Sequence, residues 1–188
     1  DQNGNILNTE FSVSDFKSSD QCVECHEDHY NEWSGSMHAY SMRDPVFYSG
    51  WNEEQLKRQD TGERFCIQCH NPAAFVSGVN LAGFETAEEL AASDYPEIIK
   101  EGIGCGICHS MTDLSQTIHT NNSIAASAVF KMNPGDGVFY GSIKNPQSNE
   151  YHESRYNPIF SRSEACLPCH DMTVRGVEAE ITFSEWNR

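Results

Sequence analysis

The sequence lacks several features that would assign it to common classes of protein. It has no apolar run near the roughly 18 residues that a membrane-spanning helix needs, so we expect no transmembrane segment. It is poor in cations, with 12 lysines and arginines against 28 acidic residues, and its net charge of −16 excludes nucleic acid as a partner. Only 38% of its residues are hydrophobic, and the mean hydropathy is −0.58. Side chains alone therefore supply little apolar surface for a large core.

No cysteine lies outside one short pattern. All eight cysteines occur as Cys-x-x-Cys followed at once by histidine, and this pattern occurs four times. Its copies are Cys22, Cys25 and His26; Cys66, Cys69 and His70; Cys105, Cys108 and His109; and Cys166, Cys169 and His170. A disulfide framework or a zinc knuckle also uses paired cysteines, but neither requires a histidine after every second cysteine.

This pattern is the attachment signature of c-type haem. The two thiols add across the vinyl groups of the porphyrin, and the adjacent histidine is held beneath the iron as an axial ligand. The sequence therefore predicts four haem c groups, each with one iron. Their proximal ligands would be His26, His70, His109 and His170.

The other histidines equal the haems in number. The chain has eight histidines, so four remain once the proximal ligands are counted. Because each of four haems needs a second axial ligand, we predict that these four are the distal ligands and that every haem is ligated by two histidines. They are His29, His38, His119 and His152.

Methionine is the alternative distal ligand, and it would raise the reduction potential relative to histidine. The five methionines are Met37, Met42, Met111, Met132 and Met172. Met111 and Met172 each follow a proximal histidine by two residues, which is too close to reach the opposite face of that haem. We expect Met37, beside His38, to fill gaps against porphyrin edges.

Four haems in 188 residues leave little protein around each haem, so the porphyrins must supply much of the buried apolar surface. We predict a multihaem cytochrome c fold, in which short helices and long loops wrap around a stack of four haems, with little β-structure. We treat residues 1–188 as a single tetrahaem domain. In it, residues 1–20 form an extended N-terminal arm, and residues 110–165 form a long loop-rich insertion that delivers His119 and His152.

Local patterns place the regular elements. Apolar spacing and helix-forming residues predict short helices, and a β-branched and aromatic run predicts a short strand at 138–143. The helices are expected at 27–33, 52–59, 86–93 and 95–102. Gly102, Gly104 and Gly106 indicate that the backbone before the third motif passes close to a macrocycle.

Covalent attachment of haem takes place after export, so we expect the protein outside the cell or at the cell surface, with the periplasm as the alternative. The polar start of the sequence, DQNGNILNTE, is typical of a mature, processed chain. Asn121 and Ser123 form a glycosylation sequon.

Two stretches resemble a known family. CVECH is followed after six residues by Trp33, and after four more by His38-Ala39, and this opening is similar to that of the tetrahaem cytochrome c-554 of ammonia oxidation. GIGCGICH resembles the third motif of that family, and the order of motifs is similar from Cys22 to His170. The resemblance implies electron transfer through closely stacked haems in alternating parallel and T-shaped pairs. Larger multihaem reductases, and tetrahaem subunits that polymerise into extracellular filaments, share this packing.

One departure from that family bears on function. The family leaves one iron without a distal histidine, whereas this chain has enough histidines for all four. We therefore predict an electron carrier and not an enzyme. The enzyme alternative, a small reductase of nitrogen species, would need an open iron.

Two kinds of electron carrier fit the sequence, and we favour a subunit of an extracellular cytochrome filament. Such a homopolymer would have haem contacts between subunits. His29 is the candidate to ligate a haem of the next subunit, because it lies three residues after His26 on the same helical face and must serve a different haem. The alternative is a soluble periplasmic shuttle. Either carrier would exchange electrons with redox partner proteins or extracellular acceptors.

Overall fold

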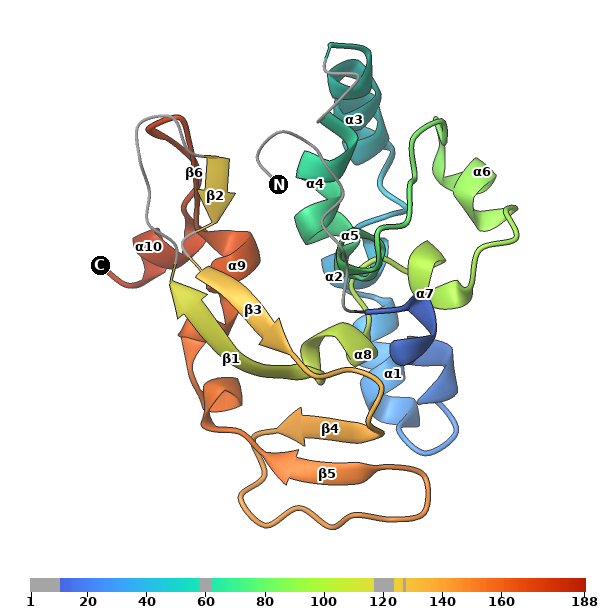
Figure 1. Ribbon diagram of the computed structural model, residues 1–188, viewed down its shortest axis with the longest axis vertical. Helices are drawn as coiled ribbons and strands as arrows, with labels where there is room; N and C mark the ends of the chain where they lie inside the picture. Colours follow the sequence, from blue (N-terminus) through green and yellow to red (C-terminus); the bar gives the residue numbers. More distant parts are fainter. Residues whose placement is uncertain (1–10, 58–61, 117–123, 127) are drawn as a thin grey trace. The chain divides into compact units, whose positions relative to one another are not determined.

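The computed structural model describes residues 11–57, 62–116, 124–126 and 128–188 (Figure 1). They form two compact units: unit 1 ends at Cys108, and unit 2 begins at His109. His119 and Asn121, for which the sequence predicts a distal ligand and a glycosylation sequon, lie outside the described residues.

Unit 1 is built from helices, and its described residues contain no strand. The helices, coloured blue to green in Figure 1, are the 3-10 helices η1 (Val13–Asp15) and η2 (Ser19–Gln21) and the α-helices α1 (Glu27–Ser34), α2 (Met37–Tyr40), α3 (Pro45–Lys57), α4 (Gly62–His70), α5 (Pro72–Ser77), α6 (Ala87–Ala91), α7 (Glu97–Lys100) and α8 (Cys105–Cys108).

Polar side chains start several of these helices. The Ser36 hydroxyl accepts a hydrogen bond from a backbone N–H of α2, and the Thr86 hydroxyl does the same for α6. Asn71 caps α5, where Pro72 occupies the first turn and has no N–H to leave unpaired. Gly78 ends α5 with a φ of 72°, a conformation that costs glycine little. The helices are short because caps and breakers follow one another closely.

The core of unit 1 lies where α4 packs against α3 and α5. Trp51, Ile67, Leu81 and Ile99 are all at most 1% exposed. Burying an aliphatic side chain of this size stabilises a fold by about 1.5–3 kcal/mol. Unit 1 therefore has an apolar core of its own.

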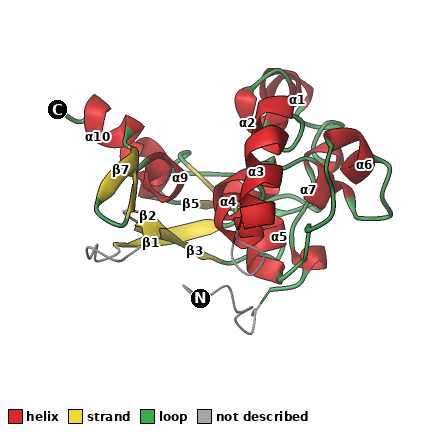
Figure 2. Cartoon of the chain, turned by 90° about the horizontal axis from the view of Figure 1, so that it is seen from above, coloured by secondary structure: helices red, strands yellow, loops and turns green. Residues whose placement is uncertain are grey.

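Unit 2 consists of small sheets joined by short helices. The antiparallel pair is β1 (Met111–Gln116) with β3 (Ala128–Met132), the three-stranded antiparallel sheet is β2 (Ile124–Ala126), β6 (Met172–Val174) and β7 (Val177–Glu180), and the parallel pair is β4 (Val138–Gly141) with β5 (Glu153–Tyr156). The helices are η3 (Pro158–Ser161), η4 (Ser163–Cys166), α9 (Leu167–His170) and α10 (Thr182–Trp186). Figure 2 shows the strands in yellow and the helices in red.

Turn chemistry fixes one of these registers. Arg175 and Gly176 connect β6 to β7 with φ angles of 50° and 82°. A two-residue hairpin turn with both φ angles positive matches the twist of the strands it joins. Glycine adopts this conformation freely, whereas Arg175 is held in it by the turn.

The predicted fold class is confirmed, because the chain consists mostly of short helices and loops with little sheet. The helices expected at 27–33 and 86–93 correspond to α1 and α6. The helix expected at 52–59 corresponds to the end of α3, which begins seven residues earlier, at Pro45. No helix among the described residues is both long and apolar enough to cross a membrane.

Two of the expected segments contain more regular structure than the sequence suggested. The expected arm at 1–20 contains η1 and the start of η2, and Phe16, Ser18 and Ser19 are buried in it. The expected loop-rich insertion at 110–165 contains the five strands β1 to β5. The single tetrahaem domain stays a prediction.

Candidate haem-binding sites

Cys22 of the first motif and Cys105 of the third converge inside unit 1. Ser19 joins these two residues, which are far apart in the sequence: its carbonyl oxygen accepts a hydrogen bond from the backbone N–H of Cys22 at 3.0 Å, and its hydroxyl accepts one from the backbone N–H of Cys105 at 3.0 Å. The neighbouring Cys105 thiol, followed by burial, raises the pKa of Cys22 well above its ordinary value. Cys22 also lies 3.8 Å from the carbonyl oxygen of Ser18. The points at which two haems would be attached are therefore neighbours.

The proximal histidine of the second motif is held by its ring nitrogen. His70 lies at the end of α4, and its Nδ1 lies 3.0 Å from the carbonyl oxygen of Ser41. The Ser41 hydroxyl donates a second hydrogen bond to the carbonyl oxygen of His70, at 3.0 Å. The ring of Phe47 stacks on the imidazole, with 4.0 Å between centroids and 15° between planes. Burial lowers the pKa of His70, which favours the neutral imidazole.

His109, the proximal histidine of the third motif, is held in the same way by a strand. Its Nδ1 lies 2.7 Å from the carbonyl oxygen of Tyr140 in β4, and Tyr140 returns a backbone hydrogen bond to the His109 carbonyl oxygen at 2.8 Å. Phe160 stacks on the ring with 10° between planes and 5.6 Å between centroids. The imidazole orientation is therefore fixed from the backbone and from one face.

These two environments fit a haem ligand. A carbonyl oxygen can only accept a hydrogen bond, so Nδ1 must carry the proton in both His70 and His109. The lone pair then lies on Nε2. A ring N–H donated to a carbonyl is the usual second contact of a histidine that binds a metal, and it fixes both the tautomer and the ring orientation.

The first motif is followed by two histidines on one surface. Cys25, His26 and His29 line a shallow pocket of about 330 Å³ together with acidic side chains that precede and begin α1. The centroids of the two imidazole rings are 6.1 Å apart, and the rings are nearly parallel. The His29 side chain is 79% exposed, and its nearest ion-pair partner is Glu32 at 3.8 Å. His29 therefore faces outward next to the first haem site.

Of the other predicted distal ligands, His152 lies close to a proximal histidine. The rings of His109 and His152 both pack against Phe139, with centroid distances of 6.5 Å and 5.0 Å. His152 Nδ1 lies 3.3 Å from the Ser154 hydroxyl. His38 lies exposed on α2, in the short helix capped by Ser36.

The fourth motif spans η4 and α9. Cys166 ends η4, His170 ends α9, and Leu167 and Pro168 between them are buried. The described residues thus place each proximal histidine at or next to the end of a helix. They bring Cys22 of the first motif to Cys105 of the third, and His152 to His109, within a single unit in each case.

The competing uses of paired cysteines find no support in the described residues. None of the eight cysteines forms a disulfide. Among the parts of the chain that the structure describes, no group of three or more histidine, cysteine or acidic side chains is arranged to hold a metal ion.

Sequence reasoning missed the groups that orient the proximal histidines. The acceptors are the carbonyl oxygens of Ser41 and Tyr140, and every residue has such an oxygen, so no residue type marks them. Phe47 and Phe160 carry a weak signal, because aromatic residues gather near the motifs. Which of these rings stacks on a histidine depends on the tertiary fold.

Comparison with known proteins agrees with this arrangement. Residues 21–110 match the family model described as cytochrome c554 and c-prime, and this range contains the first three motifs. Among solved structures, the chain is similar to a penta-heme cytochrome c552 from Thermochromatium tepidum, with a TM-score of 0.61 and 21% sequence identity. That match covers 86% of this chain but 47% of the other, so the chain spans about half the length of the cytochrome it matches. No curated protein matches the chain. The resemblance inferred from the motifs is confirmed.

Proposed function

We propose that this chain, a multihaem c-type cytochrome whose residues 21–110 match the cytochrome c554 family, transfers electrons through four haem c groups, one at each motif. The haems supply one-electron redox chemistry. The chain supplies two thiols and a proximal histidine for each haem, orients the imidazoles, and sets the spacing between haems. In this proposal it carries electrons and does not act as an enzyme.

The observation that carries the proposal is the convergence of Cys22 and Cys105, whose backbone N–H groups both donate a hydrogen bond to Ser19. Each of these cysteines is the first sulfur of its motif. Haems attached there would lie side by side, which is the arrangement that electron transfer between haems requires. A structural zinc site would instead bring both cysteines of two motifs together around one ion.

For the distal ligands we propose His29, His38, His119 and His152, as the count of histidines suggests. The shared contact of His109 and His152 with Phe139 supports a role for His152 near the third haem. With two histidines on every iron, no iron would be open to substrate.

We further propose that the chain is a subunit of an extracellular filament. The support is His29, whose outward-facing side chain adjoins His26 on the same helix. One helical face cannot present two ligands to opposite sides of one haem, so His29 would ligate a haem of a neighbouring subunit. A soluble periplasmic shuttle is the alternative, and the experiments below separate the two.

The ligation is tested on the exported, haem-loaded protein. Haem content measured against protein mass should give four haems per chain, and the electron paramagnetic resonance spectrum should contain low-spin ferric signals only. A high-spin signal would contradict complete ligation and would support the reductase. Fewer than four haems would refute the proposed count.

Electron microscopy of the native protein tests the assembly. Filaments are expected for the native chain, and single particles of one chain would favour the shuttle. His29→Ala should abolish filaments and convert one haem per chain to high spin. Glu32→Gln is the matched control, because it removes the ion-pair partner of His29 but leaves the imidazole. Filaments that survive His29→Ala would show that this histidine is not a ligand between subunits.

A further inference from the structure

A buried carboxylate lies beside the two cysteines that converge in unit 1. Glu101 follows α7 directly, is 2% exposed, and is held by Ser19 of η2. The backbone N–H of Ser19 donates to Glu101 Oε2 at 2.9 Å and to Oε1 at 3.2 Å, and the Ser19 hydroxyl donates to Oε1 at 3.2 Å. The carboxylate is therefore fixed in place by one residue.

The same serine connects the carboxylate to the third motif. The Ser19 hydroxyl accepts a hydrogen bond from the backbone N–H of Cys105 at 3.0 Å. Gly104, the residue before Cys105, leaves the space that the carboxylate fills, because a Cβ there would collide with Glu101 Oε1 and lie 2.8 Å from the Ser19 hydroxyl. This glycine is thus required by a carboxylate of the chain itself.

The ionisable groups that act on Glu101 among the described residues are acids and thiols. Within the part of the chain that the structure describes, no lysine, arginine or histidine forms an ion pair with Glu101. The titratable groups that face it are Asp20 of η2, Cys105 of α8, and Cys22, whose own pKa Glu101 helps to raise. Burial raises the pKa of Glu101 to about 7, against the opposing effect of the hydrogen bonds from Ser19.

We propose that Glu101 is a proton-binding site whose occupancy is linked to the redox state of the haems attached at Cys22 and Cys105. This inference rests on the proposed function, because it requires haems at the first and third motifs. Attachment would convert both thiols to thioethers and remove their effect on Glu101. Burial, the largest cause of its raised pKa, would remain.

The linkage follows from charge. A ferric haem c carries one more positive charge than a ferrous one, and a nearby positive charge favours the ionised carboxylate. One electron from a redox partner cancels that charge, and one proton from water then forms an O–H bond on Glu101, so the charge of the site is unchanged. By reciprocity, a protonated Glu101 raises the reduction potential of the haem to the extent that reduction tightens proton binding.

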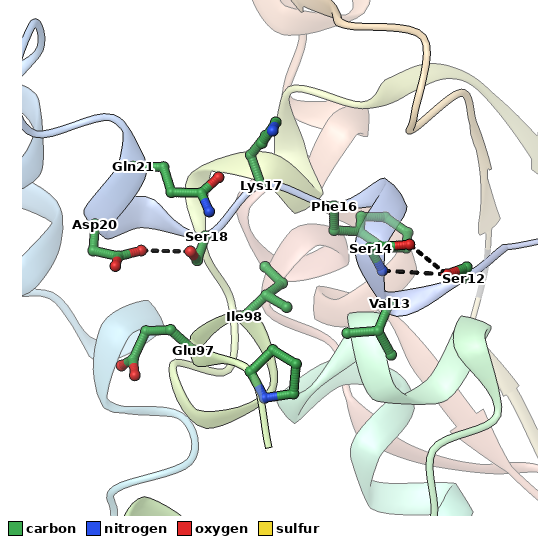
Figure 3. Close-up of a pocket in the computed structure, with 11 residues that line it drawn as sticks. Ser12, Val13, Ser14, Phe16, Lys17, Ser18, Asp20, Gln21, Glu97 and Ile98 are labelled. Carbon is green, nitrogen blue, oxygen red and sulfur yellow. Dashed lines mark hydrogen bonds between the residues drawn. The ribbon is translucent and has the colours of Figure 1, made fainter. Parts of the chain in front are cut away.

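A pocket open to solvent adjoins the two segments that contain Ser19 and Glu101. This pocket of about 580 Å³ is lined by Ser18 and Asp20, which flank Ser19, and by Glu97, one helical turn before Glu101. Figure 3 shows Asp20 and Glu97 on the pocket wall and the hydrogen bond between Ser18 and Asp20. The proton donated to Glu101 would enter from this side.

The test is a spectroelectrochemical titration of the haem-loaded protein from about pH 5.5 to pH 8.5. The midpoint potential of at least one haem should fall as pH rises through this range, and a tenfold tightening of proton binding on reduction corresponds to a fall of about 59 mV in all. Glu101→Gln should remove this dependence. Asp94→Asn, which removes an exposed carboxylate that does not line the pocket, should retain it.

A second measurement covers the case in which Glu101→Gln does not fold. The infrared difference spectrum of the unmodified protein at pH 7 should gain a protonated carboxyl band on reduction, and the band should shift in heavy water. A pH dependence that survives Glu101→Gln, or the absence of the carboxyl band, overturns the role of Glu101 while the haem absorbance stays intact. A chain without haem at Cys22 and Cys105 overturns the proposed function, and this inference with it.

Discussion

Unit 1 and unit 2 hold a proximal histidine by the same contacts but build those contacts from different secondary structure. In unit 1 the carbonyl oxygen that accepts the ring N–H of His70 follows helix α2, and in unit 2 the acceptor for His109 lies in strand β4. A phenylalanine stacks on each ring, Phe47 in one unit and Phe160 in the other. A haem ligand thus needs one carbonyl oxygen and one packing surface, and either kind of scaffold supplies them.

The units differ in how much apolar core supports these contacts. Most of the buried hydrophobic side chains among the described residues belong to unit 1. Those of unit 2 are Met111, Ala128, Val138, Ile159 and Leu167. The range that matches the cytochrome c554 family also ends two residues after the end of unit 1. Unit 2 should therefore depend more strongly on its haems for stability.

Removing one haem from each unit is the strongest test of this difference. The changes Cys166→Ala with Cys169→Ala should abolish one haem and the hydrogen-exchange protection of most of unit 2, because metal-linked folding is lost and few buried side chains remain. The changes Cys66→Ala with Cys69→Ala should abolish one haem but leave protected amides around Trp51 and Ile99. Hydrogen exchange read by mass spectrometry, with haem counted by absorbance, checks both.

The two double variants serve as controls for each other, because each removes one covalent attachment. Equal loss of protection in the two units would contradict the inferred difference. Loss of exchange protection in unit 1, with protection retained in unit 2, would mean that unit 1 is the more haem-dependent of the two.

The sequence predicts the attachment residues of both units but only part of the secondary structure that distinguishes unit 1 from unit 2. The spacing of Cys-x-x-Cys-His predicts the attachment residues directly, because the chemistry requires adjacent groups, and the shortage of apolar residues predicts short helices and loops. The strand expected at 138–143 corresponds to β4, but β1 and β3 were missed, because the runs 111–116 and 128–132 alternate weakly and pair across a long interval. The convergence of Cys22 and Cys105 depends on tertiary packing that no local pattern records.

Each unit also contains a buried asparagine that ties the segment after a proximal histidine to a distant part of that unit. Asn71 follows His70, caps α5, and donates to the carbonyl oxygen of Ile99 at 2.6 Å. Asn157 caps η3 and donates to the carbonyl oxygens of Met111 and Thr112, which follow His109. The two asparagines therefore make comparable probes of the units.

Asn71→Ala and Asn157→Ala should each destabilise their own unit by about 2–3 kcal/mol, because each loses a helix cap and leaves a buried carbonyl unpaired. The loss of amide hydrogen-exchange protection should be larger for Asn157→Ala, because the apolar core around Asn157 is smaller. Asn31→Ala, an exposed change in α1, is the control and should alter neither unit. A loss of protection that spreads equally through both units would show that they do not unfold separately.

The stacked phenylalanines give a smaller effect. Phe47→Leu should lower the free energy of unfolding by about 0.5–1.5 kcal/mol through the lost aromatic contact, in addition to the effect of the smaller buried area. Phe160→Leu should cost less, because its centroid is 5.6 Å from that of His109, against 4.0 Å between Phe47 and His70. Denaturant unfolding of the haem-loaded variants measures this order. A larger loss for Phe160→Leu would mean that unit 2 relies on this ring more than its spacing suggests.

The smallest expected effect concerns charge in unit 2. Lys131 on β3 lies 3.1 Å from the Asp113 carboxylate on β1, and both side chains are exposed. The backbone N–H of Leu114, and after it Lys131, lower the pKa of Asp113 below its ordinary value of 3.8. A lowered pKa stabilises the folded chain above pH 3.8, and this contribution is lost as pH falls through the folded pKa.

Lys131→Gln should therefore raise the pKa of Asp113 only part of the way toward 3.8, because the hydrogen bond from the Leu114 N–H remains. The thermal midpoint at pH 7 should be unchanged. A carboxylate titration followed by nuclear magnetic resonance, together with thermal unfolding, checks both. A clear fall in the thermal midpoint would mean that surface charge compensates for the small core of unit 2. An unchanged midpoint would mean that strand pairing and haem attachment, and not surface charge, stabilise this unit.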